Sequence, residues 1–187
     1  MVPTAIVLHG TTSSGKSSIA KALQATAPVP AFHISLDAFV TMSNRRDMQS
    51  DAERDQAYSI HCENLRSTLA RVVQTPFDIV LDLVLRDEPE MDACLSVLRG
   101  RPTYVVRVWA PLDVLEERER SRDDRAPGMA REQIDHPAYR RSYDLELDTS
   151  LCTPEEGAAT VRRPILERSR LTVRSSGPPA ASADFQR

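Results

Sequence analysis

Short apolar runs alternate with amphipathic stretches along most of the chain. Apolar residues dominate positions 4–9, 32–36, 77–84 and 103–109, and the run FDIVLDLV at 77–84 is apolar apart from its two aspartates. Short runs of this kind are typical of strands that are buried on both faces of a parallel sheet. We therefore predict four such strands, and a fifth, shorter strand at 145–147, where Leu, Glu and Leu alternate.

Helical patterns fill the intervals between these runs. Apolar residues recur at helical spacing from 55 to 73, and we also predict helices at 17–25, 91–98 and 111–120 and one that opens at 153–156. The last opening combines an N-cap threonine, a first-turn proline and first-turn acids. The alternation of strands and helices predicts an α/β fold with three layers. A parallel central sheet would carry helices on both faces and bind ligands at the carboxyl ends of its strands.

Length and charge limit the function classes. The 187 residues fit one domain, which we place at residues 1–173, with a disordered tail rich in Ser, Pro and Ala at 174–187. A formal net charge of −3 gives no reason to expect nucleic acid or a membrane as partner. Three widely spaced cysteines form no disulfide framework, so we expect a cytoplasmic protein. Nothing in the pattern predicts the oligomeric state.

The segment GTTSSGKS at 10–17 carries the clearest chemical signal, because it fits G-x-x-x-x-G-K-[ST] without a gap. In such a loop the backbone N–H groups surround phosphate oxygens, the lysine contacts the β- and γ-phosphates, and the last hydroxyl ligates Mg²⁺. A plain strand-to-helix turn is the alternative, but the apolar run before it and the helical pattern after it favour an ATP site. The expected phosphate contacts are Gly10, Thr11, Thr12, Ser13, Ser14, Gly15, Lys16, Ser17 and Ser18.

Two aspartates lie at the edge of the sheet where an acceptor would bind. Asp37 follows the second predicted strand and could accept the proton of an attacking hydroxyl, or orient that hydroxyl toward the γ-phosphate. Alternatively, it caps the next helix. Asp82 ends the apolar run at 79–81 and, with Ser17, could hold Mg²⁺; alternatively, it is a strand-end or N-cap residue. Asp78 begins the same strand, at the wrong edge for either role.

Arginines are dense between 118 and 131, a segment interrupted by Pro and Gly that we predict to be mobile. Phosphoryl transfer needs positive groups around the developing charge and a flap that excludes water, so this segment predicts an arginine-rich lid. Arg118, Arg122 and Arg125 could share one helical face. The alternative is a solvated surface on which the arginines pair with interleaved acids. Those acids are Glu116, Glu117, Glu119, Asp123 and Asp124.

Together these residues resemble the chloramphenicol phosphotransferase-like family of P-loop kinases. The resemblance is carried by 6–24, LDAF at 36–39, IVLD at 79–82, RERSRDDRAPGMA at 118–130 and YDLELDTS at 143–150. The family uses ATP and Mg²⁺ to phosphorylate a primary hydroxyl of chloramphenicol. The resemblance implies the P-loop NTPase fold. It also implies that Asp37 is the catalytic base, that Lys16 and Ser17 contact phosphate and metal, and that Arg122 and Arg125 are catalytic lid arginines.

The region expected to line the acceptor pocket departs from the family. Residues 41–56 are polar and charged, and HPAYRRS at 136–142 is basic. A pocket carrying Arg45, Arg46, Arg140 or Arg141 suits a polar or anionic acceptor better than an aromatic antibiotic. We expect His136, which precedes a proline, to be a surface residue.

The sequence therefore predicts an ATP-dependent O-phosphotransferase that acts on a hydroxyl-bearing small molecule. The acceptor is either an antibiotic or a metabolite such as a nucleoside, a sugar or a cofactor precursor. A regulatory module that binds nucleotide and hydrolyses it slowly is the alternative from another class. The preference for ATP over GTP has no motif of its own here, although an Asn-Lys-x-Asp guanine motif is missing.

Overall fold

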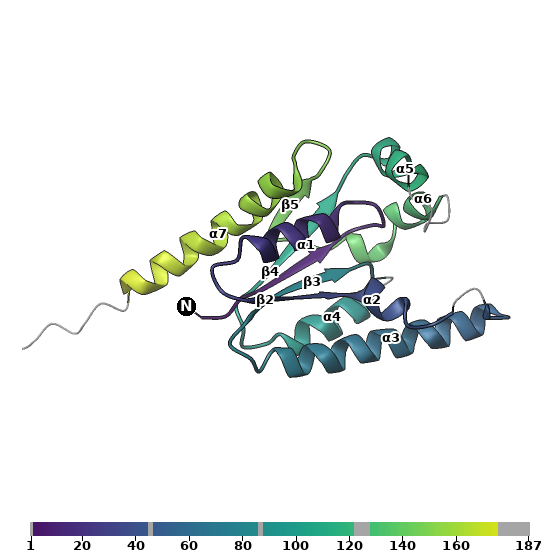
Figure 1. Cartoon of the computed structure of the whole chain (residues 1–187), viewed down its shortest axis with the longest axis horizontal. Helices are drawn as coiled ribbons and strands as arrows, with labels where there is room; N and C mark the ends of the chain where they lie inside the picture. Colours follow the sequence, from purple (N-terminus) through teal and green to yellow (C-terminus); the bar gives the residue numbers. More distant parts are fainter. Residues whose placement is uncertain (1, 45–46, 86–87, 122–127, 176–187) are drawn as a thin grey trace, which may run out of the picture.

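Five parallel strands form the central sheet (Figure 1). The computed structural model describes residues 2–44, 47–85, 88–121 and 128–175, and beyond residue 165 it describes the backbone alone. The strands are β1 (Ala5–His9), β2 (Ala31–Ser35), β3 (Asp78–Leu83), β4 (Thr103–Trp109) and β5 (Leu145–Asp148). Their order is β2-β3-β1-β4-β5, and every neighbouring pair is parallel. All five predicted strands are confirmed.

Helices cover both faces of this sheet, as predicted (Figure 1). One face packs against α1 (Lys16–Ala25) and α7 (Pro154–Ser175), and its core includes Leu8 and Val106. The other face packs against α3 (Asp51–Val72) and α4 (Glu88–Val97), around Val7 and Leu81. Because adjacent residues of one strand point to opposite faces, β1 supplies both cores.

The remaining short elements lie at the carboxyl end of the sheet. They are α2 (Leu36–Val40), α5 (Leu112–Arg120), α6 (Met129–Ile134) and the 3₁₀ turn η2 (Pro137–Tyr139). This is the end at which parallel sheets bind ligands. Among the described residues, no helix combines the length and apolar composition needed to cross a bilayer.

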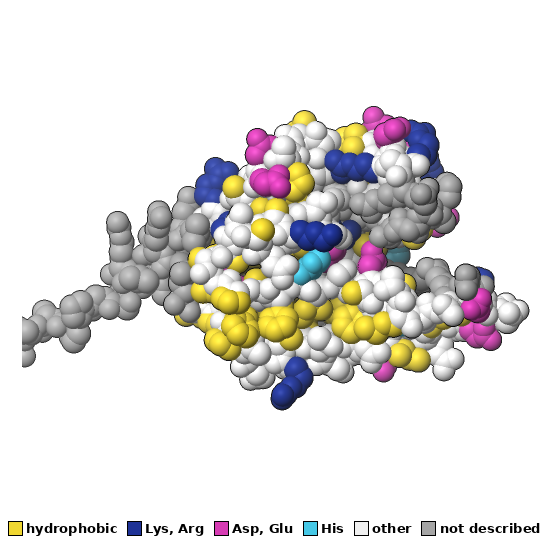
Figure 2. All heavy atoms as spheres, in the orientation of Figure 1, with side chains coloured by type: hydrophobic (Ala, Val, Ile, Leu, Met, Phe, Trp, Pro, Cys, Tyr) yellow, Lys and Arg dark blue, Asp and Glu magenta, His cyan; other side chains and the backbone are white. Residues whose placement is uncertain are grey.

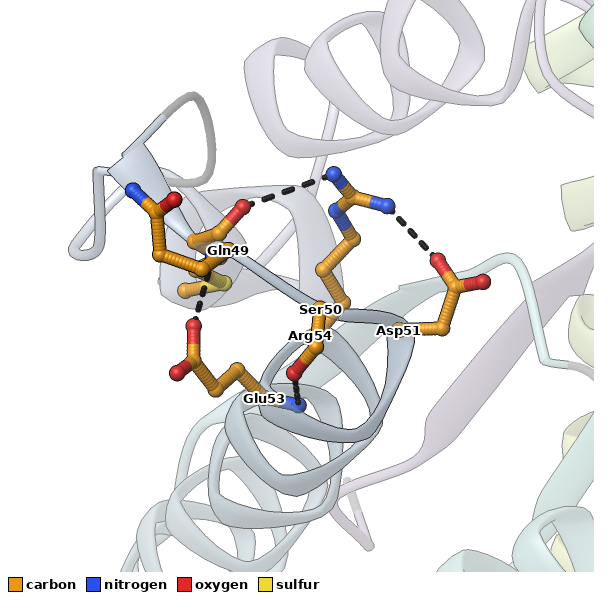
Figure 3. A network of polar contacts seen from close by, with 6 residues as sticks. Gln49, Ser50, Asp51, Glu53 and Arg54 are labelled. Carbon is orange, nitrogen blue, oxygen red and sulfur yellow. Dashed lines mark hydrogen bonds and ion pairs between the residues drawn. The ribbon is translucent and has the colours of Figure 1, made fainter.

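Helix α3 begins four residues earlier than predicted, and Figure 3 shows why. The Ser50 hydroxyl accepts a hydrogen bond from the Glu53 backbone N–H at 3.2 Å. The Glu53 carboxylate in turn accepts the Gln49 N–H at 2.6 Å, and Arg54 pairs with Asp51 at 2.6 Å. This arrangement resembles a capping box, which satisfies donors that an open helix end leaves unpaired. The polar first turn lacks the apolar spacing on which the predicted start at 55 was based.

The predicted helix at 111–120 is confirmed, and the segment at 118–131 ends in a further helix that the sequence did not predict. Helix α5 continues to Arg120, and α6 begins at Met129. The reason is Glu119, which is buried and whose carboxylate accepts the backbone N–H groups of Gly128 at 3.2 Å and of Ala130 at 2.7 Å. A buried carboxylate that satisfies the first donors of a helix fixes where that helix begins.

Candidate functional site

The GTTSSGKS segment forms a tight loop between β1 and α1. A Cβ atom on Gly10 would lie 2.0 Å from the Val108 carbonyl oxygen, so only glycine allows the loop to pass this close to β4. Gly15 adopts a φ of 90°, which favours glycine, at the position that precedes α1. Ser13 also has a positive φ, of 58°. The loop thus has the curled backbone that can present successive N–H groups to an anion.

Lys16 lies buried inside this loop. Its ammonium group donates to the Thr11 carbonyl oxygen at 2.7 Å and lies 3.5 Å from the Ser14 hydroxyl. A buried ammonium ion needs such acceptors, because its loss of hydration is otherwise costly. The lysine charge is therefore held across the loop, where a phosphate bound by the backbone would meet it.

Ser17 and Asp82 meet where α1 begins and β3 ends. The Ser17 hydroxyl donates to Asp82 Oδ2 at 2.7 Å, and the Asp82 side chain is almost completely buried. His33 Nε2 lies 3.6 Å from the same oxygen. Burial alone would raise the pKa of Asp82, but the His33 imidazole, the Lys16 ammonium and the Ser17 hydroxyl outweigh burial and hold the pKa below its ordinary value. The carboxylate is therefore ionised at neutral pH, and with the hydroxyl it forms an oxygen pair suited to Mg²⁺.

Asp37 lies in the first turn of α2, directly after β2. Ser35 is the N-cap of this helix and pairs with Asp82 across the sheet, so Asp37 stands two residues beyond the level of Asp82. Its side chain is half-buried. It is not the N-cap residue, although a first-turn acid is favourable for the helix dipole. Asp78, by contrast, lies at the opposite edge and accepts the Thr4 backbone N–H at 2.7 Å, as expected for a structural residue.

Arg118 closes the other side of the phosphate loop. Its guanidinium group donates to the Thr149 hydroxyl and carbonyl oxygens, both at 2.9 Å, and to the Ser13 carbonyl oxygen at 3.3 Å. The Thr149 hydroxyl also donates to the Ser14 carbonyl oxygen at 2.9 Å. Beside these contacts is a hollow of about 270 Å³. Its lining includes Gly15, Ser18, Arg118, Thr149, Cys152 and Pro154.

Two further contacts at the loop were not predicted from the sequence. The Gln133 side-chain oxygen accepts the Thr12 backbone N–H at 2.7 Å, which connects α6 to the phosphate loop. Thr149 bridges the loop to Arg118, and it falls in the YDLELDTS segment that carries the family resemblance. No pattern in the sequence singles out Gln133, because its partner is more than a hundred residues away.

The described arginines of the 118–131 segment divide between two roles. Arg120 pairs with Glu117 at 2.5 Å and Arg131 with Glu116 at 2.6 Å, so for these two the solvated-surface alternative is correct. Figure 2 shows basic and acidic side chains together on the surface over α5. Arg118, by contrast, turns to the phosphate loop. Arg122 and Arg125 lie outside the described residues, so their helical face and lid role stay predictions.

Several solved structures share this fold. The APS kinase CysC of Mycobacterium tuberculosis, in complex with AMPPNP and APS, is 17% identical with a TM-score of 0.66, over 88% of this chain and 98% of its own. The tunicamycin resistance protein of Deinococcus radiodurans is 17% identical with a TM-score of 0.65, over 87% and 95%. A gluconokinase of Sinorhizobium meliloti is 17% identical with a TM-score of 0.61, over 94% and 98%. Identities this low establish the fold alone.

Sequence comparison gives the family. No curated protein matches the chain. The profile of the chloramphenicol phosphotransferase-like protein family, however, matches residues 3–165. That range includes the phosphate loop, the Ser17–Asp82 pair and Asp37, and the fold is that of P-loop kinases. The chain therefore belongs to the chloramphenicol phosphotransferase-like family of P-loop kinases.

Proposed function

We propose that the protein is an ATP-dependent O-phosphotransferase that moves the γ-phosphoryl group of ATP onto a hydroxyl of a small molecule. The observation that carries this proposal is the hydrogen bond between Ser17 and the ionised Asp82, beside the buried ammonium of Lys16. Positioning and electrostatic stabilisation supply most of the catalysis in phosphoryl transfer. A positive charge and a metal-binding oxygen pair at one phosphate loop are the parts that this chemistry requires.

The phosphate end of the site has a role for each residue. The backbone N–H groups between Gly10 and Ser18 would hold the phosphate oxygens, and Lys16 would exchange its contact with the Thr11 carbonyl oxygen for the β- and γ-phosphates. Ser17 and Asp82 would hold Mg²⁺, which neutralises phosphate charge when it is bound. His33 would keep the Asp82 carboxylate oriented toward Ser17.

The hollow beside Arg118 fits the nucleotide base. It adjoins Gly15 and Ser18 of the phosphate loop, and its volume of about 270 Å³ suits a purine ring. The Arg118 guanidinium is fixed by Thr149 and is planar, so it could stack on an aromatic base. On the opposite side of the loop, the acceptor would bind near Asp37.

At the acceptor, Asp37 would take the proton of the attacking hydroxyl, or at least orient that hydroxyl in line with the γ-phosphate. Transfer would be direct, with no covalent enzyme intermediate. We propose that Arg122 and Arg125 belong to a lid that closes over the transferring group, as the family resemblance implies. A closed lid would exclude water from the transferring group.

The proposed acceptor is not limited to chloramphenicol, the antibiotic in the family name. We propose a polar acceptor, either an antibiotic or a metabolite, because the segments at 41–56 and 136–142 are charged. A cytoplasmic location, with the kinase domain at 1–173 and a tail at 174–187, completes the proposal. The alternative is a regulatory module that binds nucleotide. Slow ATP hydrolysis without phosphorylation of any acceptor would favour this alternative.

If Arg118 stacks on the nucleotide base, its substitution should weaken the binding of ATP more than the binding of inorganic triphosphate. Arg118→Gln should weaken ATP binding roughly tenfold, because a stacked cation contributes about 1–2 kcal/mol. Binding of inorganic triphosphate should fall less than that of ATP, because triphosphate has no base and is affected only through the Arg118 contact with the Ser13 carbonyl oxygen. Calorimetric titration of both ligands measures this, with the exposed Arg99→Gln as the control variant. Equal loss for ATP and triphosphate would contradict the base contact and leave Arg118 as a support of the loop.

The reaction itself predicts a new phosphorylated product. We expect purified protein with ATP and Mg²⁺ to add one phosphoryl group to a hydroxyl compound in a panel of antibiotics, nucleosides and sugars, detected by mass spectrometry. Lys16→Ala should lower the rate at least about a hundredfold, because it removes charge stabilisation at the transferring group. A Lys16→Ala enzyme with normal turnover would rule out the phosphate-loop mechanism. ATP hydrolysis with no product would favour the regulatory module.

If Asp37 is the catalytic base, Asp37→Asn should lower turnover and leave the affinity for ATP unchanged. Turnover of the acceptor found in that panel should fall by about 10²- to 10⁴-fold, as for loss of a general base. The Kd for ATP should stay within about twofold, because Asp37 does not belong to the phosphate loop. Asp113→Asn is the matched control, since Asp113 is also a first-turn acid of a helix at this end of the sheet. Parallel losses of turnover and ATP affinity in Asp37→Asn would contradict the assignment.

A further inference from the structure

Polar atoms without hydrogen-bond partners gather around His9, the last residue of β1. Among the described residues, five buried atoms of this neighbourhood have no partner. They are His9 Nε2, His136 Nδ1, Tyr139 Oη, Arg141 Nε and Arg141 Nη1. The rings of His9 and Tyr139 are 4.7 Å apart, and those of His136 and Tyr139 are 6.4 Å apart. We call these four residues the His9 cluster. His136 is thus half-buried in it and not the surface residue that the sequence suggested.

The His9 cluster adjoins the phosphate loop. His9 directly precedes Gly10, and its Nδ1 lies 3.0 Å from the Tyr143 hydroxyl, which fixes the ring. Tyr139 lines a small hollow of about 40 Å³ together with Gly10 and Thr11 of the loop. That volume exceeds what one water molecule needs. The segment that carries His136, Tyr139 and Arg141 follows α6, which itself reaches the loop through Gln133.

Several basic side chains lie close enough to His9 to influence its ring. Burial lowers the pKa of His9 to about 3, and the charges of Lys16, Arg141, His136 and Arg107 lower it in the same direction. Three acidic side chains oppose them, because the buried Asp82 carboxylate interacts with Lys16. Asp92 pairs with Arg141 at 3.3 Å and Glu146 with Arg107 at 3.2 Å, and both carboxylates are largely exposed. His9 is therefore neutral at neutral pH, and the carboxylates paired with the two arginines are exposed to solvent.

Donors dominate among the unpartnered atoms. Two belong to the Arg141 guanidinium, which can only donate, and the Tyr139 hydroxyl can donate as well. When the Tyr143 hydroxyl donates to His9 Nδ1, the ring proton is on Nε2, which adds a fourth donor. Buried polar groups nearly always have partners, and a buried guanidinium is the costliest to leave without them. A group of buried donors that includes an arginine, whose paired carboxylate is exposed, is complementary to an anion.

We propose that the His9 cluster binds an anionic group of the acceptor, a carboxylate, phosphate or sulfate ester, and so selects acceptors that carry one. Arg141 supplies the charge, Tyr139 and His136 supply neighbouring polar atoms, and Asp92 on the solvent side orients the guanidinium. This inference rests on the proposed kinase function, because it concerns the second substrate of that site.

The geometry of the sheet sets the size of such an acceptor. Asp37 follows β2 and the His9 cluster adjoins β1, and a single strand, β3, separates the two. Neighbouring strands are about 4.8 Å apart, so the two positions are separated by about 10 Å across the sheet. An acceptor whose reactive hydroxyl and anionic group lie several bonds apart can span this distance. Compounds the size of a phosphorylated or oxidised sugar meet the requirement.

Sulfate is a direct probe of the site. The enzyme is first saturated with AMP-PNP and Mg²⁺ so that the phosphate loop is occupied, and sodium sulfate is then titrated by calorimetry against sodium chloride of equal ionic strength. We expect saturable sulfate binding. It should weaken at least about tenfold in Arg141→Gln, because a hydrogen bond to a charged group is lost. Tyr139→Phe keeps the ring beside His9 and should weaken binding less.

The exposed Arg99→Gln is the matched control and should bind sulfate like the wild type. Absence of saturable binding to the wild type, or equal binding to Arg141→Gln, would overturn the inference. The second arm offers matched acceptors that differ only by an anionic group, with mass-spectrometric detection of the product. Phosphorylation confined to the anionic members supports the inference, and phosphorylation of the neutral members alone refutes it while leaving the kinase function intact. If AMP-PNP fails to bind, the kinase proposal fails, and the anion site is then judged only from the part of the sulfate binding that Arg141→Gln removes, because sulfate can also occupy the open phosphate loop.

Discussion

The hydrogen bond between Ser17 and Asp82 is the contact on which the rest of the site depends. It joins the first turn of α1 to the end of β3 at 2.7 Å. Burying a carboxylate is costly unless opposite charge and hydrogen bonds offset the lost hydration. Here Ser17, His33 and Lys16 provide that compensation and keep the group ionised. The same three neighbours place a negative oxygen beside the phosphate loop, where a metal ion is needed.

Neighbouring elements position the phosphate loop, and with it Ser17, from two sides. On the β4 side, the absence of a side chain at Gly10 lets the loop approach the Val108 carbonyl oxygen. On the α5 side, Arg118 and Thr149 donate hydrogen bonds to the carbonyl oxygens of Ser13 and Ser14. The loop is therefore positioned by neighbours that come from distant parts of the chain. Precise placement of this kind is what in-line phosphoryl transfer requires.

Much of the fold could be predicted from the sequence because its signals are local. Each strand is a short apolar run, and the phosphate loop is a contiguous motif whose flanking elements agree with it. The start of α3 was misplaced because a polar capping turn has no apolar periodicity. The role of Glu119 was missed for a different reason. Its burial depends on backbone donors at Gly128 and Ala130, and nothing in a charge-dense segment distinguishes a buried glutamate from an exposed one.

The candidate site likewise contains residues that local motifs identify and residues that only the folded structure identifies. Lys16, Ser17 and Asp82 were identifiable because each belongs to a motif or ends a strand. Gln133 and His9 gain their significance from partners more than a hundred residues away, which local patterns cannot show. The arginines illustrate the limit most clearly, since Arg118 and Arg120 are two residues apart and have opposite roles. Arg118 contacts the phosphate loop, whereas Arg120 pairs with Glu117 in solvent, because helix positions two residues apart point in different directions.

The central claim is that Ser17 and Asp82 form the metal-binding half of an ATP site. The most direct test is a calorimetric titration of ATP, with and without Mg²⁺, into the wild type and Asp82→Asn. The account predicts that Mg²⁺ strengthens ATP binding to the wild type, and that Asp82→Asn, which keeps the side-chain shape but loses the charge, reduces this gain about 10- to 100-fold. An unchanged effect of Mg²⁺ in Asp82→Asn, or no ATP binding by the wild type, would contradict it.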